Sequence, residues 1–344
     1  MQFKRWSVLK AIAPVLFLLA LIIGLIVRGP GENGAAGTGA KTAYPLTGEA
    51  FSLDTYCSIS IYAGGGEAAL SKAMDALSAY DDLLNPLKEG SDIYKINHRT
   101  SETVELQEET ARMLSAVRKL EQMSGGDFEP VIAPLTDFWD IQHRKKAPAE
   151  AEVAEKRKEV VSGAWEVKGT SFYAYAPALK IDIGAFAKGF IADRLRDLLR
   201  TEGVTSAVIS LGGNVLCLGE KPDGEPFRIG LKKPERGSEE YLDVLDINDL
   251  SVVTAGIYER YFEEDGVIYH HILDPKTGWP VQNELAAVTV VGPSSELCDA
   301  LSTTLFIKGE KDGTAFLSEW NEQEGGAYSA YFIRRGGHYT KAGA

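Results

Sequence analysis

The stretch Lys180-Ile-Asp-Ile-Gly-Ala-Phe-Ala-Lys-Gly-Phe190 joins two kinds of sequence pattern, and the rest of the chain can be read outward from it. The run 179–183 alternates like a strand and carries one acid, Asp182, before Gly184 interrupts it. From 187 to 199 apolar residues recur at helical spacing. A strand that passes through a small-residue turn into a helix is a common way to present backbone amides to phosphate. The stretch has neither GxGxxG nor GxxxxGKS/T, so a phosphate site and simple tight packing both remain open.

The rest of the chain mixes helix and strand patterns without a regular β–α–β rhythm. We expect strands at 55–62, 165–179 (as a pair), 207–211, 227–231, 250–254, 269–273, 286–291 and, closing the fold, 328–333. We expect helices at 69–84, 107–123, 187–199 and 297–307, and an exposed helical insertion at 143–159. A polar loop is expected at 85–97, and no regular element in the proline-broken stretch 128–141. This mixture predicts an α+β fold with largely antiparallel strands.

The composition is that of an ordinary globular protein, with 344 residues, of which 44% are apolar and 25% charged. An excess of 49 acidic over 36 basic residues gives a net charge of −13, which argues against non-specific binding of nucleic acid. An anionic ligand would need local compensation of this charge, for instance by a metal ion. Cys57, Cys217 and Cys298 lack the spacing of metal ligands or of a disulfide framework, so we expect buried, small apolar residues there.

The N-terminal sequence predicts attachment to a membrane. Basic residues precede an uncharged run over 11–27, which Arg28 ends. The run is just long enough to span a bilayer and longer than a usual signal-peptide core. Its preceding cations place the rest of the chain outside the cytoplasm. We expect an uncleaved anchor at 1–28, with a cleaved signal as the alternative, then a flexible linker at 29–44 and the folded domain at 45–340.

A histidine pair, His270-His271, stands where an expected strand runs into the turn sequence Asp274-Pro-Lys-Thr-Gly278. Alternate residues of a strand face opposite ways, so only one of the two rings can point into a given site. An imidazole with an ordinary pKa near ~6.5 can accept a proton at neutral pH. The pair alone leaves a structural interpretation open, with one ring on the surface and the other packed.

Asp299 and Thr303 are four residues apart near the start of the expected helix at 297–307, so they share one helix face. Carboxylate and hydroxyl oxygens suit a hard cation such as Mg²⁺. The alternative is that Asp299 only complements the helix dipole. Arg260, which follows the expected strand at 250–254, could hold a phosphate or form a structural salt bridge.

Five motifs in register resemble the ApbE family, the FAD:protein FMN transferases. They are DIGAFAKGF at 182–190, SLGGN at 210–214, TAGIYERYF at 254–262, HHILDPKTGWP at 270–280 and CDALSTTLF at 298–306. Each motif is loose by itself, but their order and spacing together are specific. The resemblance runs from about Phe51 to near the C-terminus. It implies an α+β, T-fold-like domain that binds FAD with Mg²⁺.

The resemblance also implies roles for individual residues. Asp299 and Thr303 match side-chain ligands of the metal, Ala185 matches a ligand through its backbone carbonyl, and His271 matches the catalytic position. The implied FAD contacts are Asp182, Lys188, the backbone at Leu273 and, in segments that match less closely, Leu53, Thr55 and the loop at 85–88. Arg260 joins them as the expected phosphate-binding residue.

Three departures from the family pattern stand out. Ala255 occupies a position that is usually serine, so a hydroxyl contact is lost there. Many members have Met-Gly-Thr where this chain has Leu53-Asp54-Thr55. The family's lipid-anchoring cysteine is absent, which agrees with an intact transmembrane anchor.

The function implied by the resemblance is Mg²⁺-dependent transfer of FMN from FAD to a threonine or serine hydroxyl of an acceptor protein, with release of AMP. Implied acceptors are Nqr- or Rnf-like subunits of membrane redox complexes, or related proteins with FMN-binding domains. The implied location is the outer side of the cytoplasmic membrane. Two alternatives remain at this point: hydrolysis of FAD to FMN and AMP, and flavin binding by a membrane-tethered protein without catalysis.

Overall fold

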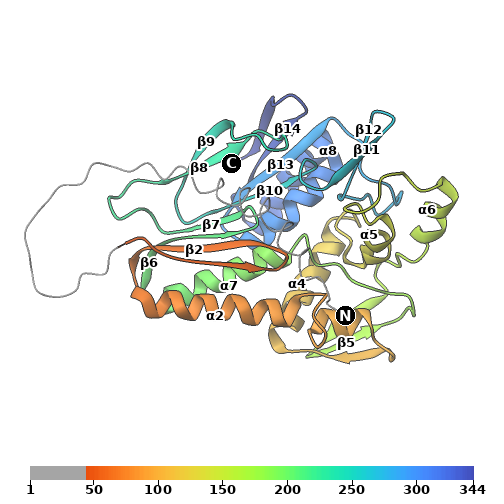
Figure 1. Ribbon diagram of the computed structural model, residues 1–344, viewed down its shortest axis with the longest axis horizontal. Coiled ribbons are helices and arrows are strands. Elements are labelled where there is room, and N and C mark those ends of the chain that lie inside the picture. Colours follow the sequence, from red (N-terminus) through yellow and green to blue (C-terminus); the bar gives the residue numbers. More distant parts are fainter. Residues whose placement is uncertain (1–43) are drawn as a thin grey trace, which may run out of the picture. The chain divides into compact units, whose positions relative to one another are not determined.

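The computed structural model describes residues 44–344, which are built around an eight-stranded antiparallel sheet (Figure 1). The strands of this sheet, in spatial order, are β1 (Leu46–Ser52), β2 (Thr55–Gly64), β6 (Val204–Leu211), β7 (Asn214–Leu218), β10 (Ser251–Gly256), β13 (Leu285–Gly292), β14 (Ser329–Arg334) and β15 (Tyr339–Gly343). The smaller sheets are β3 (Thr103–Glu105) with β5 (Ser171–Ala174) and β4 (Trp165–Lys168), β8 (Phe227–Lys232) with β9 (Tyr241–Ile247), and β11 (Tyr261–Glu264) with β12 (Val267–His270).

Three of the helices pack against the main sheet, and the others lie elsewhere. They are α2 (Gly66–Leu84), α3 (Asp92–Asn97), α4 (Glu108–Met123), the 3-10 turn η1 (Pro130–Ile132), α5 (Ala133–Trp139), α6 (Glu150–Arg157), α7 (Ala187–Thr201) and α8 (Ser295–Glu324). Helices α2, α7 and α8 pack against β1, β6 and β13. In Figure 1, α2 and α7 run below the sheet and the β8–β9 hairpin lies above it.

The strand sequences explain why both faces of the sheet are covered. Every residue of β13 is buried, which fits its nearly continuous apolar sequence. In β2 the buried residues alternate, and Cys57, Ile59 and Ile61 point to the helices. On the opposite face Tyr62 meets Phe227 of β8 edge to face, with 5.3 Å between the ring centroids. The structure therefore confirms the expected α+β class with antiparallel strands.

The expected strand at 179–183 is wrong. These residues belong to no strand of any sheet. Their backbone groups bond elsewhere: the Ile181 amide donates to Asn97 Oδ1 at 2.8 Å, and the Asp182 amide donates to the Pro130 carbonyl at 2.7 Å. The Arg99 guanidinium donates to the Leu179 carbonyl. Side chains and a loop thus satisfy the backbone in place of a neighbouring strand.

Two other expectations for loops are corrected. Residues 92–97 form helix α3, because Ser91 caps it by accepting a hydrogen bond from the Tyr94 amide at 3.0 Å. The stretch 128–141 contains η1 and α5. Its prolines sit in first helical turns, where proline is tolerated, and the Glu129 carboxylate accepts from the Val131 amide at 2.9 Å.

The C-terminal half differs from expectation in three boundaries. The expected strand at 269–273 ends at His270, and Leu273 forms only an isolated bridge with Pro280. Helix α8 is much longer than 297–307 and is interrupted at Gly309, whose φ is 76°. The strand at 328–333 is not the last, since β15 follows it at the edge of the sheet.

The remaining expectations concern cysteines and the N-terminus. All three cysteines are buried and free, as expected. The anchor at 1–28 and the linker up to residue 43 lie outside the described residues. Within residues 44–344, no helix combines the length and the apolar character that crossing a bilayer requires.

Candidate active site

The candidate site lies at one end of the main sheet, where two hairpin turns, the end of β10 and the starts of α7 and α8 converge. The strand registers put the β1–β2 turn at 53–54 and the β6–β7 turn at 212–213 at the same end. The two turns touch: a Cβ on Gly212 would lie only 2.6 Å from Thr55 Oγ1. Gly212 also has a φ of 59°, so a glycine is required on both grounds.

The start of α7 packs directly on the start of α8. The Gly189 amide donates to Asp299 Oδ2 at 3.0 Å. A Cβ on Gly189 would lie 2.3 Å from the Ser295 carbonyl oxygen, so only glycine permits this approach. The Lys188 ammonium donates to the Gly184 carbonyl at 2.7 Å and lies 3.8 Å from Asp299 Oδ2. The stretch 180–190 and Asp299, which are far apart in sequence, are therefore neighbours.

Asp299 is a buried acid with few partners. Burial raises the pKa of its carboxyl, and the Lys188 charge, the Gly189 amide and the Asn214 side chain offset part of that rise. Asn214 follows the β6–β7 turn; its Oδ1 accepts from Ser295 Oγ at 2.8 Å, which turns its Nδ2 the other way. This buried Nδ2 lies close enough to Asp299 to favour its charged form, but it makes no hydrogen bond of good geometry to any residue within 44–344. Asp299 and Asn214 together form a polar pair with unused bonding capacity.

Asp182 shapes the turn that precedes α7. Its Oδ1 accepts from the Gly184 amide at 2.8 Å and its Oδ2 accepts from Thr136 Oγ1 at 3.2 Å. Ala185 follows, half-buried, in the same turn. Because the Gly189 amide, four residues on, donates to Asp299, it does not close a helical bond to the Ala185 carbonyl. That carbonyl stays available for a cation.

The two histidines have different environments, and the strand that carries His270 ends there, so His271 already lies in the following turn. His270 is fully buried; the Ile272 amide donates to its Nδ1 at 3.2 Å, so its Nε2 carries the proton and donates to the Val281 carbonyl at 2.7 Å. His271 is exposed, and its Nδ1 lies 3.4 Å from the Arg260 carbonyl. A carbonyl only accepts, so that contact places the His271 proton on Nδ1 and leaves Nε2 free.

The pKa of His271 is lowered from its ordinary value. The main cause is desolvation by the protein around the ring, and the charges of Arg260 and Lys188 add to it. Water reaches the exposed side chain and screens part of this effect. The ring is therefore neutral at physiological pH.

Aromatic packing holds strand β12, which ends at His270 and leads directly into His271. Tyr269 stacks on Phe262 of β11 and on Trp139 of α5, with centroids 5.1 and 5.9 Å away. Trp139 Nε1 also donates to the Gly278 carbonyl at 2.7 Å, which fixes the turn after the histidines. Leu273 is buried in this cluster. Leu273 pairs with Pro280 between two backbone hydrogen bonds: the Val281 amide donates to the Ile272 carbonyl, and the Asp274 amide donates to the Trp279 carbonyl. The amide and carbonyl of Leu273 itself therefore face away from the segment that contains Pro280.

The β1–β2 turn is strained and held from two sides. Leu53 and Asp54 have φ angles of 56° and 57°, which are uncommon for residues other than glycine. The Leu53 amide donates to Asp81 Oδ1 at 2.8 Å. Asp54 Oδ2 lies 3.7 Å from the guanidinium of Arg260, whose carbonyl also accepts from the His271 amide at 3.3 Å. The turn is thereby linked to the histidine.

The oxygen atoms of Asp299, Thr303 and the Ala185 carbonyl are of the chemical kind that suits a magnesium ion. Thr303 lies one turn further along α8, half-buried, and its hydroxyl makes no hydrogen bond to any described residue. Residues 44–344 contain no group of three or more His, Cys, Asp or Glu side chains that could hold a metal. One carboxylate, one hydroxyl and one carbonyl leave positions for water and phosphate oxygens, the usual manner of binding Mg²⁺.

Sequence reasoning missed three residues of this site. Asn214 was seen only as the end of the SLGGN motif, although an amide after a double-glycine turn was an available signal. Gly189 supplies the amide for Asp299, and Asp81 anchors the β1–β2 turn. No sequence signal identifies Asp81, because its partner at Leu53 is a backbone amide.

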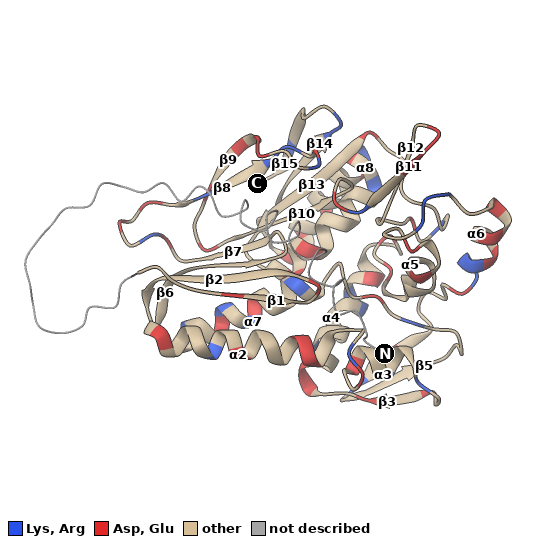
Figure 2. Cartoon of the chain, in the orientation of Figure 1, with Lys and Arg blue, Asp and Glu red and all other residues tan. Residues whose placement is uncertain are grey.

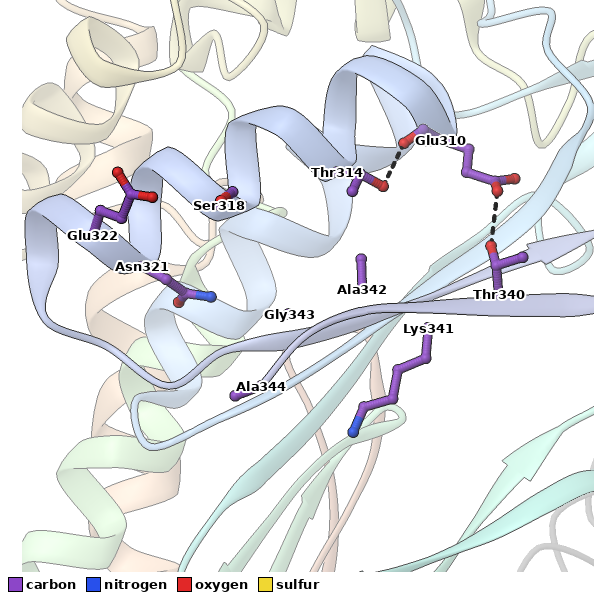
Figure 3. A pocket seen from close by; sticks show the side chains of 10 residues that line it. All are labelled: Glu310, Thr314, Ser318, Asn321, Glu322, Thr340, Lys341, Ala342, Gly343 and Ala344. Carbon is purple, nitrogen blue, oxygen red and sulfur yellow. Dashed lines mark hydrogen bonds between the residues drawn. The ribbon is translucent and has the colours of Figure 1, made fainter.

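A groove among the described residues lies away from this site. It has a volume of about 630 Å³ and runs between the second half of α8 and β15 (Figure 3). Its lining includes Glu310, Asn321 and Ala342, and Glu310 there accepts from Thr340 Oγ1 at 2.9 Å. None of the candidate site residues lines this groove.

Comparisons with known proteins agree on one family. The ApbE family matches residues 53–328. A FAD:protein FMN transferase of Klebsiella pneumoniae (strain 342) is 36% identical over 260 residues, which cover 74% of this chain and 79% of that protein. A FAD:protein FMN transferase of Vibrio cholerae is 28% identical over 250 residues, 72% and 75% of the two chains. The crystal structure of the ApbE protein from Thermotoga maritima superposes with a TM-score of 0.78 at 26% identity and covers 87% of this chain and 97% of that one.

Proposed function

This chain belongs to the ApbE family, and from that premise we propose that it transfers FMN from FAD to the hydroxyl of a threonine or serine in an acceptor protein, with release of AMP. The observation that carries the proposal is the meeting of His271, Lys188 and Asp299 at one end of the sheet. A proton acceptor, a fixed cation and a buried metal-ligating carboxylate are the groups that attack on a pyrophosphate requires.

His271 is the proposed general base. Its neutral ring holds its proton on Nδ1, against the Arg260 carbonyl, so Nε2 can accept the proton of the acceptor hydroxyl. The hydroxyl oxygen then forms a bond to the phosphorus of the FMN half, and the bond from that phosphorus to the bridging oxygen breaks. AMP leaves with the electron pair. The fixed tautomer means that no rearrangement of the ring precedes the step.

The remaining site residues are proposed to hold FAD. The Lys188 ammonium and the Arg260 guanidinium are partly exposed cations that suit the phosphates. Asp182 keeps the turn before α7 in shape, and the outward-facing backbone at Leu273 can bond the nucleotide. Thr55, packed under Gly212, supports the flavin end together with Leu53.

We propose that Asp299, Thr303 and the Ala185 carbonyl hold Mg²⁺. When bound, the ion would neutralise charge on the phosphoryl oxygens. Calorimetry provides a test that does not depend on turnover: Asp299→Asn should weaken Mg²⁺ binding to the full-length protein at least about tenfold, because the charged ligand is lost. His271→Asn is the matched control and should bind Mg²⁺ as the wild type does. Equal affinity for Asp299→Asn would remove the metal assignment.

The transfer reaction is tested by incubating the full-length protein with FAD, Mg²⁺ and a purified FMN-binding acceptor domain. We expect covalent flavin fluorescence on the acceptor and one AMP per flavin attached. AMP release at the same rate without acceptor, and no labelled acceptor, would instead identify a FAD pyrophosphatase. FAD binding without AMP release under any condition would identify a non-catalytic flavin carrier.

We further propose that the chain is anchored in the cytoplasmic membrane with residues 45–340 on the outer side. The support comes from the uncharged run at 11–27 and the basic residues before it. An enzyme so placed meets membrane redox complexes, and Nqr- or Rnf-like subunits or other FMN-binding domains are its proposed acceptors.

A further inference from the structure

The backbone over 176–181 leads directly into the turn 182–185 of the candidate site. Within residues 44–344 no strand pairs with it, so no ladder of hydrogen bonds sets its register. Leu179, Ile181 and Ile183 are buried, which fixes the face that points into the core. Burial alone does not fix the register, because a shift by two residues would keep the same alternation of inward and outward side chains. Hydrogen bonds to the backbone must therefore decide where the turn lies.

The side chain of Asn97 takes the place of a neighbouring strand. Its Oδ1 accepts from the Ile181 amide at 2.8 Å, and its Nδ2 donates to the Ile181 carbonyl at 2.9 Å. One carboxamide thus satisfies both backbone groups of a single residue. Because both bonds form only when Ile181 lies opposite Asn97, this pair sets the register of the segment.

Arg99 holds the preceding part of the same backbone. Its Nη2 donates to the Ala176 carbonyl at 2.6 Å and to the Pro177 carbonyl at 3.2 Å. Its Nη1 donates to the Leu179 carbonyl and, at 3.1 Å, to the Ile96 carbonyl. A guanidinium holds its donors in one fixed planar fork, which the single ammonium of a lysine cannot reproduce. Arg99 therefore fixes the shape of the segment as well as its place.

Both side chains stand on a support that is itself held in place. Asn97 is the last residue of α3, which lies in the lower right part of Figure 2 together with β3 and β5. Ser91 caps this helix, and the buried Asp92 accepts from the Gln107 amide, just before α4, at 2.7 Å. Helix α3 is thus tied to α4, so Asn97 and Arg99 hold the segment from a fixed element.

The position of the segment passes directly to the site. Asp182 follows Ile181, and its amide donates to the Pro130 carbonyl at 2.7 Å. Its carboxylate accepts from the Gly184 amide at 2.8 Å, and the Ala185 carbonyl is the proposed backbone ligand of Mg²⁺. A backbone ligand has no side chain that could adjust its place, so its position depends on the chain that leads to it.

We propose that Asn97 and Arg99 are positioning residues, which set the register of 176–181 and thereby place Asp182 and the Ala185 carbonyl at the site. The inference rests on the proposed metal site and the proposed transfer function. The two residues act through the turn and not by touching FAD or the ion. They keep the turn in its binding position before either ligand arrives, which lowers the ordering cost of binding.

The test compares Asn97→Asp with Asn321→Asp in the full-length protein. Asn321 is a matched control, because its side chain pairs in the same way with the Tyr328 amide and carbonyl, at 3.0 and 2.9 Å, and lines the groove away from the site. In each variant the new carboxylate loses the donor and repels the carbonyl that it faces. Both variants should lose similar stability in urea unfolding.

Only Asn97→Asp should weaken Mg²⁺ binding in calorimetry, by about fivefold or more, since a misplaced turn lowers the fraction of protein that is ready to bind. It should raise the Kd and the KM for FAD in the same direction, with a smaller effect on kcat at saturating FAD and Mg²⁺. Arg99→Lys, which keeps the charge but loses the fork, should shift these constants in the same way.

Two results would overturn the positioning role. Unchanged affinities for Mg²⁺ and FAD in both Asn97→Asp and Arg99→Lys would show that the turn keeps its place without these side chains. An equal loss of affinity in Asn321→Asp would show that the effect follows general destabilisation. A wild-type protein that transfers no flavin would refute the proposed function, whereas the Kd for FAD in the variants would still decide the role of Asn97.

Discussion

The adjacent residues His270 and His271 hold opposite tautomers because each meets a different backbone group. An amide donates to His270 Nδ1, whereas a carbonyl faces His271 Nδ1. His270 is buried edge-on to Phe306, 5.8 Å between centroids, and burial lowers its pKa to about 4. It therefore stays neutral and structural, and only His271 has a nitrogen open to the site.

The pH dependence of transfer should follow His271. A base must be neutral, so activity is lost as pH falls through its pKa in the folded protein. That pKa is lowered, which predicts that kcat/KM stays level below pH ~6.5 before it declines. Lys188→Gln removes one of the charges that lower the pKa, so the decline should move to higher pH. Profiles of kcat/KM from acidic to neutral pH measure both effects.

His270→Asn is the control for this profile. It should destabilise the protein by about 1–3 kcal/mol, since it disturbs buried hydrogen bonds, but leave the acid limb in place. A wild-type decline centred above pH 6.5, or an acid limb that moves with His270→Asn, would contradict the assignment of the base to His271.

The sequence indicates the chemically distinctive residues of the candidate site more readily than the supporting ones. His271, Asp299 and Lys188 are recognisable because their side chains carry the chemistry at typical motif spacings, and the structure brings them together. Asn214 and Asp81 act by orienting other groups. Their partners lie 85 and 28 residues away in the sequence (Asp299 and Leu53), and only tertiary packing creates those contacts.

At the level of elements, the approach of α7 to α8 depends on Gly189. Gly189→Ala places a methyl group 2.3 Å from the Ser295 carbonyl and 2.6 Å from Glu296 Cα, both backbone atoms of α8. The helices must move apart, which should cost about 1–3 kcal/mol of stability and weaken Mg²⁺ binding by displacing the amide that holds Asp299. Chemical denaturation and calorimetry measure the two effects.

Gly169→Ala is the contrasting variant, because nothing lies within 4 Å of a Cβ there, although its φ of 59° also disfavours alanine. It should lose stability through the backbone alone and leave Mg²⁺ affinity unchanged. If Gly189→Ala also kept the wild-type affinity, the contact between the helices would not be what positions Asp299.

Asp81 connects the β1–β2 turn to the end of α2. Burial opposes its charge, but Lys88, Asn85 and the Leu53 amide outweigh burial and lower the pKa of the carboxyl. A lowered pKa means that this stabilisation is present above the unfolded-state pKa near ~3.9 and is lost as pH falls through the folded-state value. Asp81→Asn should therefore destabilise by about 1–3 kcal/mol at neutral pH and by less below pH ~4.

Urea unfolding of the wild type and of Asp81→Asn at several pH values measures this dependence. Asp82→Asn, on the adjacent exposed residue, serves as the control and should change stability little at any pH. An Asp81→Asn deficit that persists unchanged into acid would mean that the carboxylate charge is not what joins the two elements.

Helices and sheet strands with strong periodicity were predictable, and segments held by side chains were not. Helix α4 begins one residue from its expected start and ends where expected, because its apolar face is continuous. The run 179–183 has strand periodicity, yet Asn97, Arg99 and Pro130 take its backbone bonds, so no strand can pair with it. The periodicity of apolar residues in a sequence indicates which face of a segment is buried. It does not indicate which groups form hydrogen bonds with the backbone of that segment.

At the level of the whole molecule, a net charge of −13 opposes the approach of FAD, which is itself an anion. The cations near His271 offset this only locally, since Lys188 and Arg260 each lie beside an acid. A bound Mg²⁺ would therefore attract a pyrophosphate to the site. The negative net charge of the chain thus makes the affinity for FAD depend on this cation.

The last prediction concerns the N-terminal residues. Residues 44–344 have a main core that draws on β2, α2, α7, β13 and α8, so they should fold without the preceding residues. Deletion of residues 1–43 should give a protein with unchanged kcat for transfer in solution.

Full-length protein should sediment with membranes and resist extraction by alkaline carbonate, whereas the form without residues 1–43 should remain in the supernatant. The basic residues before 11–27 predict that external protease digests residues 44–344 in spheroplasts. Full-length protein in the soluble fraction, or protection of this part from external protease, would contradict the proposed anchor and orientation.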